Sequence, residues 1–250
     1  MSPSSRGPER LEGVTAIILA AGVGSRMQSQ VPKVLHQLLG RPMAGWVVAA
    51  AAEAFTEKSV VVLSPATAGL AELLGGSVSI AEQPKPLGTA DAVRCALAAL
   101  PASAKELLIA CGDTPLITAA LMREVVAARR ETNAPIALAA FDADDPTGYG
   151  RVIESSDGTA ECVIEERDAS EEQRAIVTVN AGLYAVDRAW LTEALGAITP
   201  SKASGELYLT DLIAAAHAAG TPAPIVYGPE IELEGVNDRH QFADVVAALR

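Results

Sequence analysis

A glycine-containing segment near the amino end of the chain could bind phosphate. Residues 19–27 read LAAGVGSRM, and glycines in a turn let backbone N–H groups approach phosphate oxygens closely. Arg26 lies just past the glycines and Lys33 follows seven residues later, so two cations could converge on one triphosphate. A tight turn without a ligand is an equally good reading of the two glycines by themselves.

Two other phosphate-binding patterns do not match this segment. Met27 stands where the dinucleotide-binding pattern GxGxxG requires its third glycine. The GK[ST] of a P-loop is missing as well. Hydrolase chemistry has no support either, because the chain contains no GxSxG.

Two oxygen-bearing side chains could bind a divalent cation. Asp113 follows an apolar run and a glycine, which places its carboxylate at the carboxyl end of a predicted parallel strand, where open α/β sheets bind ligands. Asn237, in EGVNDR, could supply a second oxygen, and oxygen is the ligand that Mg²⁺ prefers. By sequence, Asp113 could equally cap the helix that starts near Thr118, and Asn237 could cap the last helix.

The elements that must position these side chains alternate between strands and helices. Short apolar runs at residues 14–20, 59–64, 77–81 and 106–110 are typical of buried parallel strands. Helices are predicted between and after them, at residues 43–55, 90–100 and 119–130. This alternation predicts an open, mostly parallel sheet with helices on both faces.

From Pro135 the pattern changes to shorter strands separated by polar stretches, which predicts a smaller, more antiparallel lobe built onto the sheet. The charged segment 165–174 is typical of a solvated helix or loop. The predicted elements are strands at 136–141, 150–154, 178–186 and 224–227, and helices at 190–195, 208–219 and 239–249.

Composition excludes several classes of protein. The net charge of −12 leaves no basic surface for nonspecific binding to nucleic acid or anionic lipid. The apolar runs are far shorter than the roughly 20 residues of a membrane span. Three cysteines without a CxxC pair or zinc spacing indicate a reduced cytoplasm. The polar start, MSPSSRGPERLEG, predicts a disordered tail rather than a targeting peptide.

Nine motifs in order resemble a known family. They are LAAGVGSRM, PKVLHQLLGRPM, QPKPLGTADAV, CGDTPLI, TGYGRVI, IEERDA, VNAGLYA, GELYLTD and EGVNDR. Together they resemble the uridyltransferase domain of bifunctional N-acetylglucosamine-1-phosphate uridyltransferase/glucosamine-1-phosphate acetyltransferases. The first two are shared by sugar and alditol nucleotidyltransferases in general, whereas TGYGR, EERDA, NAG and GELYLTD indicate the amino-sugar branch.

The resemblance implies a Rossmann-like fold and a Mg²⁺-dependent UDP-N-acetylglucosamine pyrophosphorylase. Such an enzyme transfers UMP from UTP to N-acetylglucosamine 1-phosphate and releases pyrophosphate, for cell-wall precursor biosynthesis in the cytoplasm. Residues 1–13 are then expected to be the disordered tail and residues 14–250 the nucleotidyltransferase domain. Within that domain, residues 14–134 would bind the nucleotide, 135–237 the sugar, and 238–250 would form a closing helix.

The resemblance also implies roles for particular residues. Arg26 and Lys33 would be catalytic, and Asp113 and Asn237 would hold Mg²⁺. Gln83 would hydrogen-bond the pyrimidine and Thr89 would supply a hydroxyl. The implied nucleotide-binding set is Leu19, Ala21, Gly22, Gly24, Gln83, Gly88 and Thr89, and the implied sugar-binding set is Gly150, Glu165, Asn180 and Thr210.

The chain departs from the family pattern in two places. Cys111 stands where the family usually has an aromatic residue before Gly-Asp, so a contact near the substrate is expected to be lost. No hexapeptide-repeat β-helix occurs in these residues, so neither acetyl transfer nor the trimer that the β-helix builds is expected. The oligomeric state is otherwise open, as is whether this is a stand-alone transferase or part of a longer chain.

Two alternatives compete with the amino-sugar assignment. A related transferase could use another acceptor, such as glucose 1-phosphate, a methylerythritol phosphate or a molybdopterin, but the motifs around Gly150, Glu165 and Asn180 disfavour it. A regulatory module could bind nucleotide without catalysis. Such a module could lose any one of Arg26, Lys33, Asp113 and Asn237, so the presence of all four disfavours it. Release of pyrophosphate from UTP separates these classes.

Overall fold

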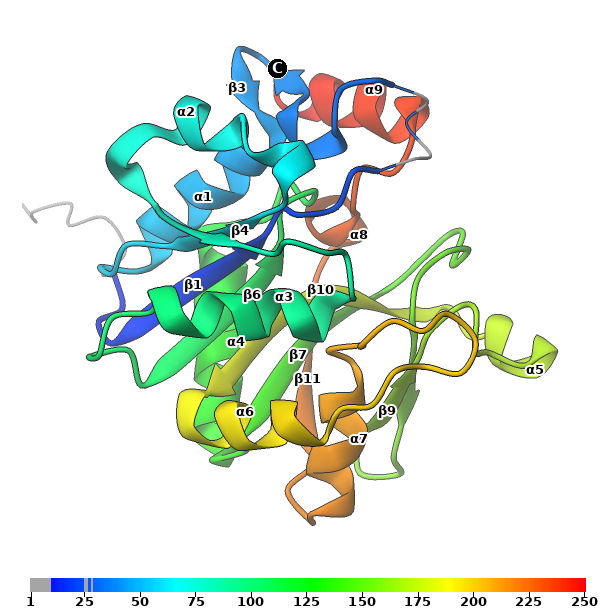
Figure 1. Cartoon of the computed structure of the whole chain (residues 1–250). Helices are drawn as coiled ribbons and strands as arrows, with labels where there is room; N and C mark the ends of the chain where they lie inside the picture. Colours follow the sequence, from blue (N-terminus) through cyan, green and yellow to red (C-terminus); the bar gives the residue numbers. More distant parts are fainter. Residues whose placement is uncertain (1–9, 25–26, 28) are drawn as a thin grey trace, which may run out of the picture.

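Strands with buried, β-branched cores form one mixed sheet. The computed structural model describes residues 10–24, 27 and 29–250, and within them nine strands pair in the order β5-β4-β1-β6-β10-β7-β11-β9-β8 (Figure 1). The strands are β1 (Val14–Leu19), β4 (Val60–Leu63), β5 (Ser79–Glu82), β6 (Glu106–Cys111), β7 (Ile136–Asp142), β8 (Arg151–Glu154), β9 (Thr159–Ile164), β10 (Thr178–Asp187) and β11 (Ala223–Tyr227). A separate hairpin joins β2 (Gln37–Leu38) to β3 (Arg41–Pro42).

The amino-terminal half of the sheet is parallel, which confirms that part of the prediction. β1 pairs in parallel with both β4 and β6, and β4 pairs in parallel with β5. Every residue of β4 is buried, as expected of a strand covered by helices on both faces. The carboxyl ends of these strands therefore lie together along one edge of the sheet.

The second half continues the same sheet and makes it mixed. β10 is antiparallel to both β6 and β7, and it joins the two halves through backbone hydrogen bonds. The predicted mixed lobe is confirmed by the outer strands, where β9 runs antiparallel to β11 and β8 antiparallel to β9. β9 was not predicted, because only Ala160 and Val163 in it are buried and the exposed Glu161 lies between them, so it has no continuous apolar run.

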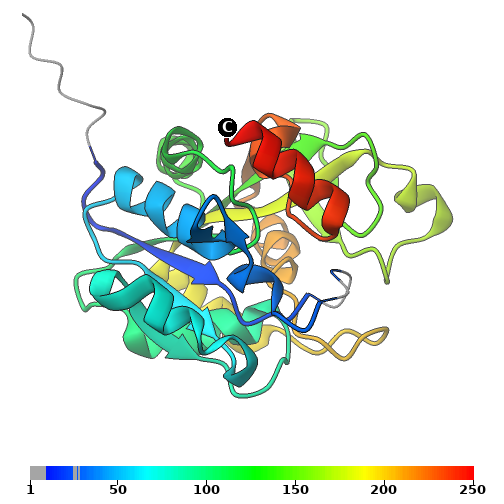
Figure 2. The same cartoon turned by 90° about the horizontal axis from the view of Figure 1, so that it is seen from above.

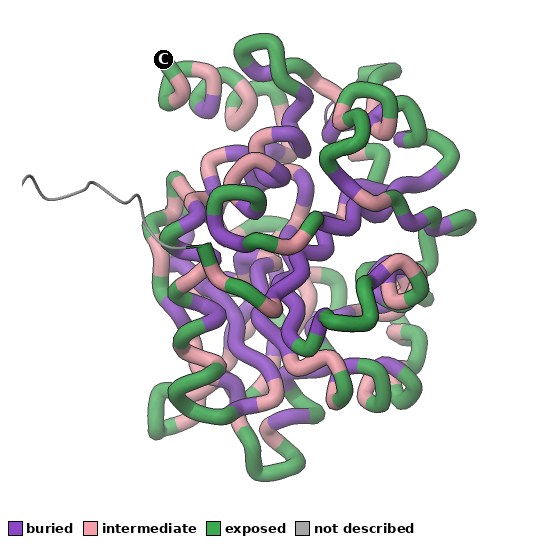
Figure 3. Tube along the Cα trace, turned by 90° about the vertical axis from the view of Figure 1, so that its left-hand side faces the viewer, coloured by how far each residue is buried: buried purple, intermediate pink, exposed green. Residues whose placement is uncertain are grey.

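Helices cover both faces of the sheet, as predicted. They are α1 (Met43–Ala54), α2 (Leu70–Leu74), α3 (Thr89–Ala96), α4 (Ala119–Thr132), α5 (Glu171–Arg174), α6 (Arg188–Ala194), α7 (Asp211–Ala218), α8 (Glu230–Leu233) and α9 (Arg239–Ala248). One core cluster packs α1, α2 and α4 against one face, and a second packs α3, α6 and α7 against the other. Figure 3 shows the resulting buried trace through the centre of the molecule.

The last helix closes over the β2–β3 hairpin (Figures 1 and 2). Val245 of α9 packs in a third, smaller cluster with Leu38 and Met43. The helix occupies almost the residues predicted for it, 239–249. No helix in the described part of the chain is both long and apolar enough to cross a membrane.

Residues 10–13, the last four of the predicted tail, contact the carboxyl end of α1. The Arg10 Nε donates a hydrogen bond to the Phe55 carbonyl at 2.8 Å, and the Leu11 N–H donates to the Ala54 carbonyl at 2.9 Å. These carbonyls lie at the carboxyl end of α1, where helix carbonyls need partners from outside the helix. The first nine residues of the predicted tail lie outside the described residues.

Candidate active site

Two adjoining cavities open at the carboxyl ends of β1 and β6. The first has a volume of about 280 Å³ and the second of about 200 Å³, and both are bordered by Leu19, Thr89, Cys111 and Asp113. Every predicted site residue that the structure describes borders at least one of them. The first cavity is bordered by Leu19, Ala21, Gly22, Gly24, Lys33, Gln83, Gly88, Thr89 and Asp113. The second is bordered by Gly150, Glu165, Asn180, Thr210 and Asn237, besides the shared residues.

The glycine loop packs against the stem of Lys33. Gly24 has φ +70°, and a Cβ at that position would lie 2.5 Å from the Lys33 Cβ. Lys33 itself begins a 3-10 turn, and its N–H donates to the Val23 carbonyl at 3.2 Å. The second glycine of the pattern is therefore required by the close approach of the lysine. Arg26, the other predicted catalytic cation, lies outside the described residues.

Lys33, Asp113 and Asn237 meet where the two cavities join. Lys33 is only 8% exposed, and its ammonium forms an ion pair with the Asp113 carboxylate. It also donates a hydrogen bond to Asn237 Oδ1 at 3.0 Å. A buried cation thus lies between two oxygens that the chain supplies from segments more than 100 residues apart.

Helix capping was the alternative role for Asp113 and Asn237, but other residues nearby cap both helices. Thr118 caps α4, since its hydroxyl accepts from the Leu121 N–H at 3.2 Å. Asp238 caps α9, since its carboxylate accepts from the N–H groups of His240 and Gln241. Neither Asp113 nor Asn237 is therefore the N-cap of its neighbouring helix.

The oxygens of Asp113 and Asn237 fit a small divalent cation. Both contact the same ammonium, so they converge on one cation-sized position. Gly235 lies beside this position, since a Cβ there would be in ordinary contact, at 3.6 Å, with Asp113 Oδ1. Within the described residues no group of three or more His, Cys, Asp or Glu side chains could hold a metal. The two oxygens could hold a divalent cation of the kind that is bound by one or two carboxylates together with substrate phosphates.

The loop around Gly88 is held by a second segment of the chain. Gly88 has φ +115°, and a Cβ there would lie 2.4 Å from the Leu207 carbonyl oxygen. The Gln83 amide donates to the Gly88 carbonyl at 3.0 Å and to Asp91 Oδ2 at 2.9 Å. Thr89 Oγ1 accepts from the Leu209 N–H at 2.9 Å. These contacts orient the Gln83 amide with both hydrogens used, so its Oε1 is the atom that can accept a hydrogen bond from a ligand.

Glu165 lies against Gly150 in the wall of the second cavity. A Cβ on Gly150 would lie 2.8 Å from Val163 Cγ1 and 3.4 Å from Glu165 Oε2, so a larger residue would first collide with Val163, beside the carboxylate of Glu165. The Thr210 hydroxyl donates to Glu165 Oε1 at 2.8 Å. Burial raises the pKa of the Glu165 carboxyl; the Thr210 hydrogen bond opposes this, and the nearby Asp211, Asp168 and Glu206 reinforce it.

Glu165→Gln is expected to stabilise the folded protein at neutral pH. The raised pKa means that the folded protein keeps a proton at pH values where the unfolded chain has lost it, so the wild-type carboxylate costs stability as pH rises above its ordinary pKa of 4.5. Thermal unfolding should show a higher Tm for the variant at pH 7.5 and no gain at pH 4. Each 1 kcal/mol corresponds to about 2–4 °C for a chain of this size.

Glu161→Gln is the matched control for this measurement. Glu161 belongs to the preceding strand β9 and is exposed, so its neutralisation should leave the Tm nearly unchanged at both pH values. An equal gain from both variants would attribute the effect to the net charge of the protein rather than to the buried site.

Asn180 is oriented by a tyrosine that sequence analysis did not assign. The Asn180 Nδ2 donates to the Tyr184 hydroxyl at 2.7 Å, and Asn180 Oδ1 accepts from the Gly182 N–H at 3.2 Å. Tyr184 borders the second cavity, and burial raises its pKa, so the phenol remains protonated. The sequence signal that could have identified Tyr184 was its position four residues after Asn180, within the same motif VNAGLYA.

Cys111 lies at the boundary between the cavities. Its Sγ is 2.7 Å from the position that a Cβ on Gly182 would take, so the thiol fills the space that this glycine leaves. Burial, followed by the charge of Asp113, raises the pKa of the thiol to about 12. Cys111 is therefore a neutral boundary residue and not a nucleophile.

Comparisons with known proteins agree on the kind of domain. The model of the MobA-like NTP transferase domain matches residues 16–231. Among curated proteins, the bifunctional protein GlmU of Sorangium cellulosum is 43% identical over 238 residues, which is 92% of this chain and 50% of that protein. The GlmU of Caldanaerobacter subterraneus is 40% identical over 240 residues, 96% of this chain and 52% of that protein. The GlmU of Mycobacterium tuberculosis is 39% identical over 247 residues, 95% of this chain and 50% of that protein. The chain thus spans about half the length of the curated relatives it matches.

Proposed function

The chain belongs to the family of the MobA-like NTP transferase domain, and from this premise we propose that it transfers UMP from UTP to N-acetylglucosamine 1-phosphate. The products are UDP-N-acetylglucosamine and pyrophosphate. The observation that carries the proposal is the junction of two cavities at Lys33, Asp113 and Asn237. One cavity would take the nucleotide and the other the sugar phosphate, so that the two phosphates meet beside a buried cation.

The reaction would be an in-line attack of a sugar 1-phosphate oxygen on the α-phosphorus of UTP. Pyrophosphate leaves with the electron pair of the broken P–O bond, and no general base is needed because the attacking phosphate is already ionised. The protein has to hold two polyanions together and neutralise the charge that develops on oxygen. Lys33 is suited to that task, and we assign Arg26 to the same role.

A divalent cation, which we take to be Mg²⁺, would supply further neutralisation of phosphate charge when bound. Asp113 and Asn237 are the residues that would hold it. The ammonium of Lys33 now contacts both oxygens, so we expect Lys33 to turn toward the triphosphate when the ion is held there.

Two features of the cavities support the choice of substrates. The Gln83 Oε1, oriented by the contacts of its Nε2, can accept a hydrogen bond from the N3–H of uracil. In the second cavity, the Asn180 amide and the Glu165 carboxylate can bind an acetamido group and ring hydroxyls. Gly150 and Thr210 complete this proposed sugar site.

Pyrophosphate release tests both the activity and the acceptor. With UTP and Mg²⁺ saturating, kcat/KM for N-acetylglucosamine 1-phosphate should exceed that for glucose 1-phosphate about tenfold or more. A site built for the acetamido group leaves polar atoms unpaired when it is missing, at about 1–3 kcal/mol each. Asn180→Ala should shrink this ratio by harming the acetamido sugar more.

The outcomes separate the rival functions. Equal use of both sugars by the unmodified protein would contradict the amino-sugar assignment and leave a nucleotidyltransferase of another acceptor. No pyrophosphate with any sugar or alditol phosphate, while UTP still binds, would favour a regulatory module that binds nucleotide without transferring it.

A further inference from the structure

A buried arginine lies directly behind the wall of the second cavity. Arg151 is 1% exposed and is among the largest fully buried side chains of the described chain. It follows Gly150 at the start of β8, where it pairs with Ile164 of β9. That register sets Gly150 opposite Glu165, which follows Ile164. Arg151 and Glu166, the next residue along each segment, do not border the cavity.

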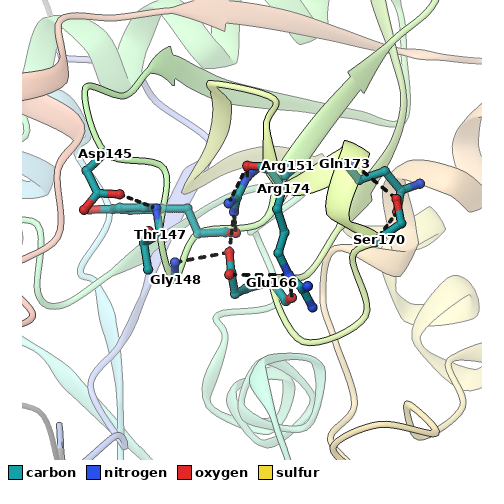
Figure 4. Close-up of polar contacts among 9 residues, drawn as sticks. Asp145, Thr147, Gly148, Arg151, Glu166, Ser170, Gln173 and Arg174 are labelled. Carbon is teal, nitrogen blue, oxygen red and sulfur yellow. Dashed lines mark hydrogen bonds and ion pairs between the residues drawn. The ribbon is translucent and has the colours of Figure 1, made fainter.

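Arg151 and Glu166 form an ion pair that ties these two segments together (Figure 4). The Arg151 NH1 lies 2.8 Å from Glu166 Oε2 and also donates to the Tyr149 carbonyl. Glu166 Oε2 accepts from the Gly148 N–H at 3.3 Å. The Arg151 NH2 donates to the Arg174 carbonyl at 3.1 Å, which attaches the far end of the 165–174 segment.

The pair holds the backbone that borders the cavity. Of the three residues 148–150, the first is held by Glu166 and the second by Arg151. The third is held through its carbonyl, which accepts from the Asn180 N–H at 2.8 Å. All three residues border the second cavity, so the ion pair and Asn180 together set the position of this wall.

Stability is a weak reason for such a pair. The Arg151 side chain is 2% exposed and the Glu166 side chain 30%, so it is mainly the arginine charge that leaves water, at a cost in free energy. Apolar residues of similar volume often serve a core equally well. A planar guanidinium, however, can direct several hydrogen bonds at fixed angles. Its four contacts here go to the backbone carbonyls of Tyr149 and Arg174 and to the Glu166 carboxylate, within the two segments that frame Gly150 and Glu165.

We infer that the Arg151–Glu166 ion pair is a positioning device for acceptor recognition, which sets Gly150 and Glu165 at the separation that the sugar phosphate requires. The inference rests on the proposed function, since it assigns the second cavity to the acceptor. Neither residue touches the substrate. Their effect passes through the backbone of residues 148–150 and through the neighbouring Glu165.

Glu166→Gln tests the inference with little change in shape. Glutamine can still accept from the Gly148 N–H, but it carries no charge to pair with Arg151. The KM for N-acetylglucosamine 1-phosphate should rise about tenfold, which corresponds to 1.4 kcal/mol, while the KM for UTP and kcat stay within about twofold. Arg151→Lys keeps the positive charge but loses the planar guanidinium and its several hydrogen bonds, so it should also raise the KM for N-acetylglucosamine 1-phosphate.

Glu106→Gln is the matched control. Glu106 is buried, whereas Glu166 is partly exposed, and it too pairs with arginines, Arg129 and Arg130, at the amino end of β6, away from the cavities. Its variant should lower the Tm without raising the acceptor KM. Hydrogen exchange of the unliganded protein gives an independent readout: residues 147–151 should exchange faster in Glu166→Gln than in Glu106→Gln.

The possible results discriminate. A tenfold rise confined to the acceptor KM, together with faster exchange at residues 147–151, would support the inference. An unchanged acceptor KM, a parallel rise in the UTP KM, or the same acceptor effect in Glu106→Gln would overturn it while the proposed function stood. An unmodified protein that releases no pyrophosphate would overturn the proposed function first, and the inference with it.

Discussion

Lys33→Ala is expected to lower turnover about 10²-fold or more while the fold stays intact, the usual scale for loss of one charge-stabilising group at a transition state. Lys33 is 8% exposed as a residue and lies where the two cavities join. A positive charge that is largely shielded from solvent acts on developing phosphate charge with less screening by water than a surface charge would have. Steady-state pyrophosphate release, with both substrates saturating, measures the effect on kcat.

Two further variants make that result interpretable. Lys33→Met keeps most of the stem that packs against Gly24 but removes the charge, so it should be as slow as Lys33→Ala. Lys105→Ala removes an exposed lysine just before the amino end of β6 and should leave kcat unchanged. Near-normal turnover in Lys33→Met would show that packing, and not charge, is what the lysine supplies.

Asp113→Asn is expected to raise the Mg²⁺ concentration needed for half-maximal activity by about tenfold or more, equivalent to 1.4 kcal/mol. A charged oxygen binds Mg²⁺ more strongly than a neutral amide, so Asn237→Ala should have the smaller effect. Activity titrated with Mg²⁺ at saturating substrates gives both values, and excess chelator should abolish turnover of the unmodified protein.

The ion pair between Asp113 and Lys33 requires a control of its own. If the carboxylate served only to orient the lysine, Asp113→Asn would lower kcat at every Mg²⁺ concentration without shifting the titration. Asp157→Asn, in the exposed turn between β8 and β9, should change neither quantity. An enzyme fully active in chelator would remove the metal from the proposed mechanism altogether.

The parallel half of the fold could be predicted from sequence because its signals are local. A strand with a continuous apolar run, such as Val60–Leu63, is buried only if both of its faces are covered. Its alternation with helices then implies parallel strands joined by helical crossovers. β9 lacked such a run, since its mixture of buried, partly exposed and exposed residues reflects a position at the outer part of the sheet. The contacts of residues 10–13 were missed for a related reason: their partners are carbonyls at the end of α1, and composition carries no information about them.

The candidate site also has features that could be predicted from local sequence and others that depend on distant segments of the chain. The residue types at strand ends and in glycine turns can be read from the sequence, and they predict that phosphate and a cation could be bound there. Tertiary structure decided that Thr118 and Asp238 cap the helices, and that Asp113 and Asn237 instead meet at Lys33. It also placed Arg151 beside Glu166, through the register of β8 with β9. A helix or strand is set largely by its own residues, whereas the partner of a buried charge depends on which distant segment the fold brings within about 3 Å of it.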